Sequence, residues 1–116
     1  HRDELRLLLG GVEMASFASR GEARMAALAL RLAEGNFLAR ERGEFPVLLL
    51  DDVFSELDQH RREFVLGVIK GYPQALLTSA DLQQLSGHEL GGAHIFSVSD
   101  GHVSLECSGI DSSAVN

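Results

Sequence analysis

The segment that most constrains the fold of this 116-residue chain is the apolar run at residues 47–50, which leads directly into Asp51 and Asp52. A short, continuous apolar run of this kind is typical of a buried strand in a parallel sheet. A pattern rich in Ala, Leu, Arg and Glu predicts a long helix at residues 21–42, and a second helix is predicted at residues 59–70. The order favours an α/β fold with both acids at the carboxyl end of a parallel strand, where such sheets bind ligands.

Three further segments complete the predicted sheet. Residues 5–10 and residues 74–80 each predict a short strand. Residues 93–106 alternate between apolar and polar side chains around Asp100-Gly101, a pair typical of a type I′ hairpin turn. We therefore expect a parallel sheet that is buried on both faces at residues 47–50, with a terminal antiparallel hairpin at its edge.

Each predicted helix has an apolar face and boundary signals. In the first helix the expected buried residues are Met25, Leu28, Ala29 and Leu32, and Gly43 is expected to end it. In the second helix the expected buried residues are Phe64, Val65, Val68 and Ile69. Ser55 or Asp58 could cap that second helix, because both residue types favour the N-cap position.

Composition and charge exclude several classes of protein. The formal net charge of -7 argues against a free-standing nucleic-acid module, because phosphate contacts need basic surface. No apolar run is long enough to span a bilayer, and a single cysteine, Cys107, excludes an internal disulfide. We expect a cytoplasmic, acidic, globular domain or part of one, without a membrane partner.

The two acids suggest phosphate chemistry. We expect Asp51 to hold Mg²⁺, directly or through water, and Asp52 to orient or deprotonate an attacking water. The alternative is that the acids only end a strand and cap a turn. Ser19 and Gly21 lie just before the long helix, where a hydroxyl and free main-chain N–H groups could bind a phosphate. Ser19 could equally be an ordinary N-cap.

Three segments together resemble the RecF family of bacterial recombination-mediator ATPases, whose heads are similar to those of ABC and structural-maintenance-of-chromosomes ATPases. These segments are FASRGEARMAALALRLAE, PVLLLDDVFSELDQHRR and QALLTSAD, and the opening HRDEL also fits the family. The resemblance implies a parallel-sheet P-loop NTPase head of the ABC type. Residues 1–18 would end the signature-bearing lobe, and residues 19–116 would form the C-terminal part of the head.

The same resemblance implies a role for each matched motif residue. The signature motif would be Ser19, Arg20, Gly21 and Glu22, in contact with ATP held by the opposite subunit. Asp51 would be the Mg²⁺-linked acid of Walker B, and Asp52 the catalytic carboxylate, where most ABC ATPases have Glu. Ser55 and Asp58 would belong to the D-loop. Thr78 and Ser79 would form the switch region, where many relatives have a histidine.

One motif of such a head does not occur in this sequence. There is no GxxxxGK[ST] phosphate-binding loop, and the sole lysine is Lys70. In the RecF family that loop lies near the N-terminus. We therefore expect this chain to be roughly the last third of a head and, by itself, to bind ATP weakly and not to hydrolyse it.

The resemblance implies a parent protein that uses ATP and Mg²⁺ and forms an ATP-dependent homodimer. It would bind DNA at single-strand/double-strand junctions and work with recombination-mediator proteins to load recombinase at single-strand gaps during DNA repair and replication. Two alternatives stay open. One is a degenerate, non-catalytic head retained for partner binding, and the other is a receiver domain, which would need a lysine after its last strand.

Overall fold

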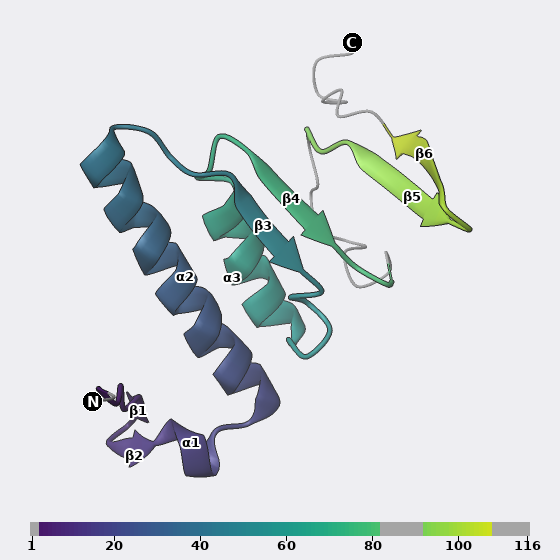
Figure 1. The fold of residues 1–116 in the computed structure, drawn as a ribbon. Coiled ribbons are helices and arrows are strands. Elements are labelled where there is room, and N and C mark those ends of the chain that lie inside the picture. Colours follow the sequence, from purple (N-terminus) through teal and green to yellow (C-terminus); the bar gives the residue numbers. More distant parts are fainter. Residues whose placement is uncertain (1–2, 82–91, 108–116) are drawn as a thin grey trace. The chain divides into compact units, whose positions relative to one another are not determined.

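A computed structural model describes residues 3–81 and 92–107 of the chain (Figure 1). The chain divides into two compact units, His1–Gln84 and Leu85–Asn116. His1 and Arg2 of the opening HRDEL lie outside the described residues. The strands of the described part pair in three separate two-stranded sheets, whereas the sequence predicts one sheet with a hairpin at its edge.

The first unit has the predicted order of helix, strand, helix and strand. Its elements are β1 (Leu8–Leu9), β2 (Val12–Glu13), α1 (Met14–Phe17), α2 (Arg20–Arg42), β3 (Leu48–Asp51), α3 (Gln59–Ile69) and β4 (Ala75–Thr78). β1 and β2 are antiparallel, and β3 and β4 are parallel. Figure 1 shows β3 and β4 side by side, with α3 behind them. The α/β interpretation and the parallel pairing are therefore confirmed.

The helix boundaries follow the predicted capping signals. Ser19 is the N-cap of α2, and its Oγ accepts a hydrogen bond from the N–H of Glu22. Gly43 ends α2 in the left-handed conformation, with φ 76°, which glycine adopts without steric cost. Asp58 is the N-cap of α3, with its side chain accepting from the N–H of Arg61. Of the two capping candidates for α3, Asp58 rather than Ser55 has that role.

The buried faces of the two helices agree only in part with the prediction. In α2, Leu28 is buried and Met25 and Leu32 are half-buried, but Ala29 is exposed. The buried face of α2 runs through Gly21, Leu28 and Gly35, and so passes beside Ala29. In α3, Val65 and Leu66 are buried, whereas Phe64 is 59% exposed. None of the described helices is both long enough and apolar enough to cross a membrane.

The core of the first unit connects both long helices with β3 and with the loop that follows it. Its buried apolar residues are Leu28, Leu48, Leu50, Phe54, Leu57, Val65 and Leu66. Phe54 and Val65, each 1% exposed, are the most completely enclosed. Because Phe54 lies in the loop after β3, that loop is anchored in the core at the point where the two acids leave the strand.

The prediction that β3 is buried on both faces is wrong. Leu48 and Leu50 are each 9% exposed, but Leu49 between them is 70% exposed, and its neighbour on β4, Leu76, is 54% exposed. Successive side chains of a strand point to opposite faces. Among the described residues of this unit, apolar packing covers only the face of the β3–β4 pair that carries Leu48 and Leu50.

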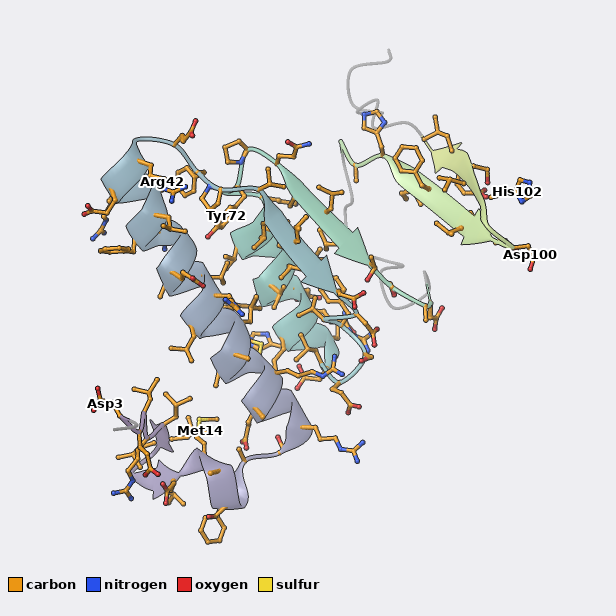
Figure 2. All side chains as sticks on the ribbon, in the orientation of Figure 1. Asp3, Met14, Arg42, Tyr72, Asp100 and His102 are labelled. Atoms are coloured by element: carbon orange, nitrogen blue, oxygen red, sulfur yellow. The ribbon has the colours of Figure 1, made fainter. Side chains whose placement is uncertain are left out.

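The second unit contains the predicted terminal hairpin, formed by β5 (Ile95–Ser99) and β6 (His102–Cys107) in antiparallel pairing. Figure 2 labels Asp100 and His102 at its tip. Asp100 and Gly101 have φ values of 49° and 77°, as a type I′ turn requires. The sequence signal Asp-Gly therefore predicted both the position and the handedness of this turn.

Candidate nucleotide and metal site

The two acids lie at the carboxyl end of the parallel strand pair. Asp51 ends β3 and lies opposite Thr78, which ends β4. The Thr78 hydroxyl donates a hydrogen bond to Asp51 Oδ1, and its oxygen accepts one from the Asp52 N–H at 3.0 Å. Within the described residues the Asp51 carboxylate has no other hydrogen bond or ion pair, so Asp51 Oδ2 can accept a further partner.

Asp52 has a left-handed backbone conformation, with φ 49°. Few residues other than glycine adopt this conformation, although Asp and Asn tolerate it better than most. The Asp52 N–H also lies 3.2 Å from the Thr78 carbonyl oxygen. The Asp52 carbonyl accepts hydrogen bonds from Arg24 Nη1 at 2.5 Å and from Ser55 Oγ at 3.4 Å. The backbone of Asp52 is therefore held on both sides, while no described residue pairs with its half-buried carboxylate.

Two of the four predicted signature residues, Ser19 and Glu22, form a capping box at the start of α2. The Glu22 N–H donates to Ser19 Oγ at 3.1 Å, and the Ser19 N–H donates to Glu22 Oε2 at 2.8 Å. Ser19 is thus an N-cap, and its hydroxyl proton can still be donated. The Glu22 N–H is used in this cap, and the Glu22 carboxylate already lies at this end of the helix. The N–H groups of Arg20 and Gly21 have no acceptor within the helix and are the ones that could face an anion. The Arg20 side chain, 87% exposed, adds positive charge there.

The loop after β3 packs directly against the start of α2. Gly21 is buried, and a Cβ atom at this position would lie 2.9 Å from the carbonyl oxygen of Glu56. Only glycine therefore fits without a shift of the main chain. The Arg20 guanidinium also lies 3.8 Å from the Glu56 carboxylate. The predicted signature and D-loop segments are thus in contact within a single chain.

The two predicted D-loop residues, Ser55 and Asp58, are both exposed and have local partners. Ser55 bonds to the Asp52 carbonyl as described above. Asp58 Oδ1 accepts from the Arg61 N–H at 2.9 Å, and Asp58 Oδ2 lies 3.2 Å from Arg61 Nη1. Both interactions hold the loop and the start of α3 in place, and both leave the loop's outer surface free to meet another molecule.

Of the two predicted switch residues, the structure brings only Thr78 to the acids. The Ser79 hydroxyl instead donates to the Asp81 carbonyl at 2.9 Å and accepts from the Asp81 N–H at 3.2 Å. Ser79 therefore stabilises its own turn. Thr78 takes the contact with Asp51 because the parallel register places the two residues opposite each other.

Sequence reasoning missed two arginines that hold the loop. Arg24 donates to the Asp52 carbonyl, and Arg62 Nε donates to the Phe54 carbonyl at 3.3 Å. A signal for Arg24 was present, because it lies three residues after Gly21 and four before Leu28, on the buried face of α2. A charged side chain on such a face needs a polar partner. Arg62, beside Arg61 in the first turns of α3, gave no comparable signal.

The donor atoms at the acidic end suit a hard cation. No group of three or more His, Cys, Asp or Glu side chains is placed to hold a metal ion within residues 3–81 and 92–107. Mg²⁺, however, prefers oxygen ligands and commonly takes only one or two carboxylates, with water and phosphate oxygens completing its shell. Asp51 Oδ2 can therefore serve as one ligand of an Mg²⁺ ion whose other ligands are water and phosphate oxygens. The arrangement is not that of a metal site in which the protein supplies every ligand.

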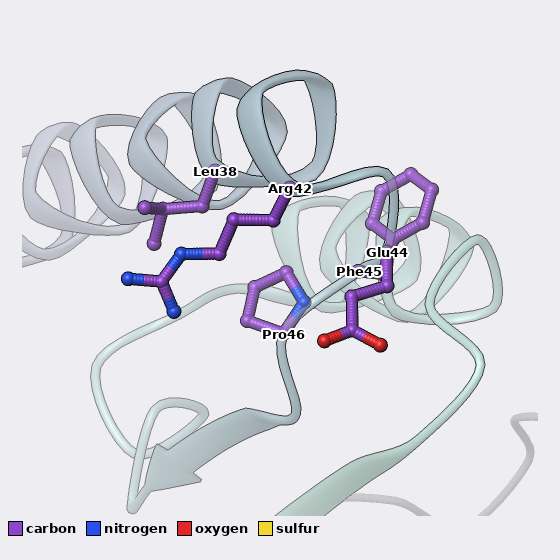
Figure 3. Close-up of a pocket in the computed structure, with 5 residues that line it drawn as sticks. All are labelled: Leu38, Arg42, Glu44, Phe45 and Pro46. Atoms are coloured by element: carbon purple, nitrogen blue, oxygen red, sulfur yellow. The ribbon is translucent and has the colours of Figure 1, made fainter.

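A small pocket lies at the other end of β3, before the strand begins. Leu38, Arg42, Glu44, Phe45 and Pro46 line it (Figure 3). Its volume is about 60 Å³, far below the several hundred Å³ of a pocket for a nucleotide-sized ligand. The candidate site rests instead on the polar residues described above, at the acidic end of β3 and β4 and at the start of α2.

The sequence is similar to those of RecF proteins. It is 42% identical over 111 residues to the DNA replication and repair protein RecF of Symbiobacterium thermophilum. The aligned residues cover 95% of this chain and 30% of that protein. It is 40% identical over 100 residues to RecF of Halothermothrix orenii, covering 86% of this chain and 27% of the relative. It is 51% identical over 82 residues to RecF of Deinococcus radiodurans, and these residues cover 71% of this chain and 23% of that protein. No protein-family model matches the chain.

The fold is similar to solved RecF structures. One, described as the recombination mediator protein RecF-ATP in the RecFOR pathway, gives a TM-score of 0.60 at 34% identity, covering 88% of this chain and 26% of that one. A second, described as RecF-ATPrS, gives the same values. These matches leave the receiver-domain alternative without support. The chain belongs to the RecF family, and it spans 23–30% of the length of the three RecF proteins compared above.

Proposed function

We propose that this chain supplies part of an ATP-hydrolysing head that acts in DNA replication and repair. The observation that carries the proposal is the pair of acids at the carboxyl end of β3, tied to β4 by the Thr78 hydroxyl. The similarity to solved RecF structures described with ATP and with ATPrS supports a nucleotide as the ligand. A head of the ABC type also needs a phosphate-binding loop, which another segment or chain would supply.

In this proposal the two acids have different tasks. Asp51 Oδ2 would hold Mg²⁺, which neutralises charge on the phosphates when bound. The Asp52 carboxylate, which has no partner among the described residues, would accept a hydrogen bond from the attacking water and take its proton. The four main-chain contacts of Asp52 fix the point from which this carboxylate reaches the water.

The start of α2 would bind the nucleotide of a second copy. The Ser19 hydroxyl, the N–H groups of Arg20 and Gly21 and the exposed Arg20 side chain would contact the phosphate. The carboxylates of Glu22 and Glu56 lie beside them, so Arg20 would have to turn from Glu56 to the phosphate. This geometry supports an ATP-dependent homodimer in which each subunit completes the site of the other. We propose that the dimer binds DNA at single-strand/double-strand junctions. There it would work with recombination-mediator proteins and help load recombinase at single-strand gaps.

The test uses the complete gene product and the variants Asp51→Asn and Asp52→Asn. Nucleotide binding is measured with a fluorescent ATP analogue, and hydrolysis by phosphate release, both with and without Mg²⁺. We expect Asp52→Asn to keep nucleotide affinity within about threefold while lowering hydrolysis about 100-fold or more, because removal of a general base costs that much. Asp51→Asn should lower the Mg²⁺-dependent part of nucleotide binding. Sedimentation velocity with ATP tests the homodimer.

Asp100→Asn is the matched control. Asp100 and Asp52 share the φ value of 49°, and Asn is accepted in this conformation, so both changes remove a carboxylate without altering the backbone. Asp100→Asn should leave binding and hydrolysis unchanged. A complete gene product that binds no ATP would contradict the proposal and favour a non-catalytic head retained for partner binding.

A further inference from the structure

Arg24 is a half-buried arginine whose described partner is a main-chain oxygen. Its Nη1 atom lies 2.5 Å from the carbonyl oxygen of Asp52, and no carboxylate pairs with it within the described residues. Partial burial of a charge is unfavourable unless a polar group compensates it. A charge-assisted hydrogen bond to a carbonyl provides that compensation, and it is stronger than a bond between neutral groups.

The same loop is held a second time by the first turn of α2. Gly21 packs against the Glu56 carbonyl so closely that a methyl group would not fit. Arg24 and Gly21 are three residues apart on one face of the helix, and they contact the loop at its first residue and near its end. Two such contacts, one electrostatic and one steric, hold residues 52–58 against the start of α2.

We infer that Arg24 is a positioning residue that couples the N-terminus of α2 to the Asp52 carboxylate by holding the Asp52 carbonyl. The effect of this contact on ATP hydrolysis rests on the proposed function. The start of α2 would contact ATP of the second subunit, whereas Asp52 would act on ATP of its own subunit. A shift of α2 on binding the first nucleotide would then move the acid that acts on the second. Arg24 thus makes hydrolysis at one site depend on occupancy of the other.

Three variants of the complete gene product test the inference. Arg24→Met removes the guanidinium but keeps an unbranched apolar chain, and Arg24→Lys keeps the charge on a shorter donor. The control is Arg31→Met, on the same helix two turns later, where the exposed arginine pairs with Glu34 at 2.9 Å. Thermal unfolding followed by circular dichroism checks that all three variants fold.

The first readout is hydrogen–deuterium exchange without nucleotide. Arg24→Met should raise the exchange rate of residues 52–58 about tenfold, since it removes a charge-assisted bond, and Arg24→Lys should raise it less. Arg31→Met should not change it. Equal exchange in Arg24→Met and Arg31→Met would overturn the inference. This readout needs no ATP, so it decides the inference even if the protein binds none and the proposed function fails.

The second readout is steady-state ATP hydrolysis. We expect Arg24→Met to lower kcat about tenfold with KM for ATP changed less than twofold, and to lower the Hill coefficient toward one. Arg24→Lys should recover part of kcat and of the cooperativity. A purely structural role would lower the amount of active protein and leave the Hill coefficient at the wild-type value. That result, with kcat per folded molecule unchanged, would contradict the coupling.

Discussion

Gly21 shows how one residue without a side chain positions two segments of the site. Its backbone lies against the Glu56 carbonyl, where a Cβ atom would approach to 2.9 Å. The resemblance to RecF proteins implies that this glycine contacts ATP of the opposite subunit. The structure adds a second reason, which is close approach by the chain's own loop.

The Gly21 contact predicts a measurable loss of stability. Gly21→Ala should lower the free energy of unfolding by about 1–3 kcal/mol, because the Glu56 main chain must move to admit the methyl group. Urea denaturation followed by circular dichroism measures this change. Gly67→Ala is the control, because Gly67 lies in α3 with no atom within 4 Å of an added Cβ. It should stabilise by up to about 1 kcal/mol through helix propensity, and equal effects of both changes would refute the packing argument.

At the scale of elements, the parallel pair β3–β4 presents the acids as a unit. Among the described side chains, Thr78 is the one that is hydrogen-bonded to both residues, through its bonds to the Asp51 carboxylate and the Asp52 N–H. The pairing register, with Asp51 opposite Thr78, makes this contact possible. The two strand ends are therefore held together by a side chain as well as by the sheet's own hydrogen bonds.

A test at this scale replaces the hydroxyl with a methyl group of similar shape. Thr78→Val should lower the free energy of unfolding by about 1 kcal/mol, because the Asp52 N–H and the Asp51 carboxylate lose a partner. In the complete gene product it should also lower the rate of ATP hydrolysis. Thr78→Ser restores the hydroxyl and should recover most of the rate. Thermal unfolding and phosphate release measure the two effects, and a Thr78→Val rate equal to wild type would contradict this role.

Local signals in the sequence predicted the elements well, and contacts between elements poorly. The Ser19 N-cap, the Gly43 helix end and the Asp100-Gly101 turn depend on neighbours within a few residues, and the sequence indicated each of them, the Ser19 cap as one of two interpretations. The return bond from Ser19 to the Glu22 carboxylate was not predicted. The prediction that Leu49 is buried was wrong, because an apolar run in a sequence does not show whether a second layer covers the strand. The Arg24–Asp52 bond joins residues 28 apart, so only the folded chain brings it into view.

At the scale of the whole molecule, the described part of the first unit has a one-sided sheet. Leu49 and Leu76 are paired across β3 and β4 and are 70% and 54% exposed. Adjacent exposed apolar side chains on a sheet favour association. This surface contributes little to the stability of the unit, whose buried residues lie on the opposite face of the strands.

That asymmetry predicts how the 116-residue chain behaves in solution. Leu49→Thr combined with Leu76→Thr should reduce self-association in sedimentation velocity, while changing the unfolding free energy by less than about 1 kcal/mol, because Thr suits exposed strand positions. Leu50→Thr is the control, since Leu50 is 9% exposed. It should destabilise the chain by about 2 kcal/mol or more. Unchanged association in the double variant would refute the role of this face.

The left-handed backbone at Asp52 also bears on how such a site can evolve. An exchange of Asp for Glu is usually discussed as a change in the distance between the backbone and the carboxylate, by one methylene group. At a φ of 49° it is also a matter of conformation, because the short Asp side chain tolerates this region better than Glu does. A longer acid at residue 52 would therefore carry a conformational cost unless the path of the loop also changed. The type of acid at position 52 and the backbone conformation of the loop are therefore expected to change together in evolution.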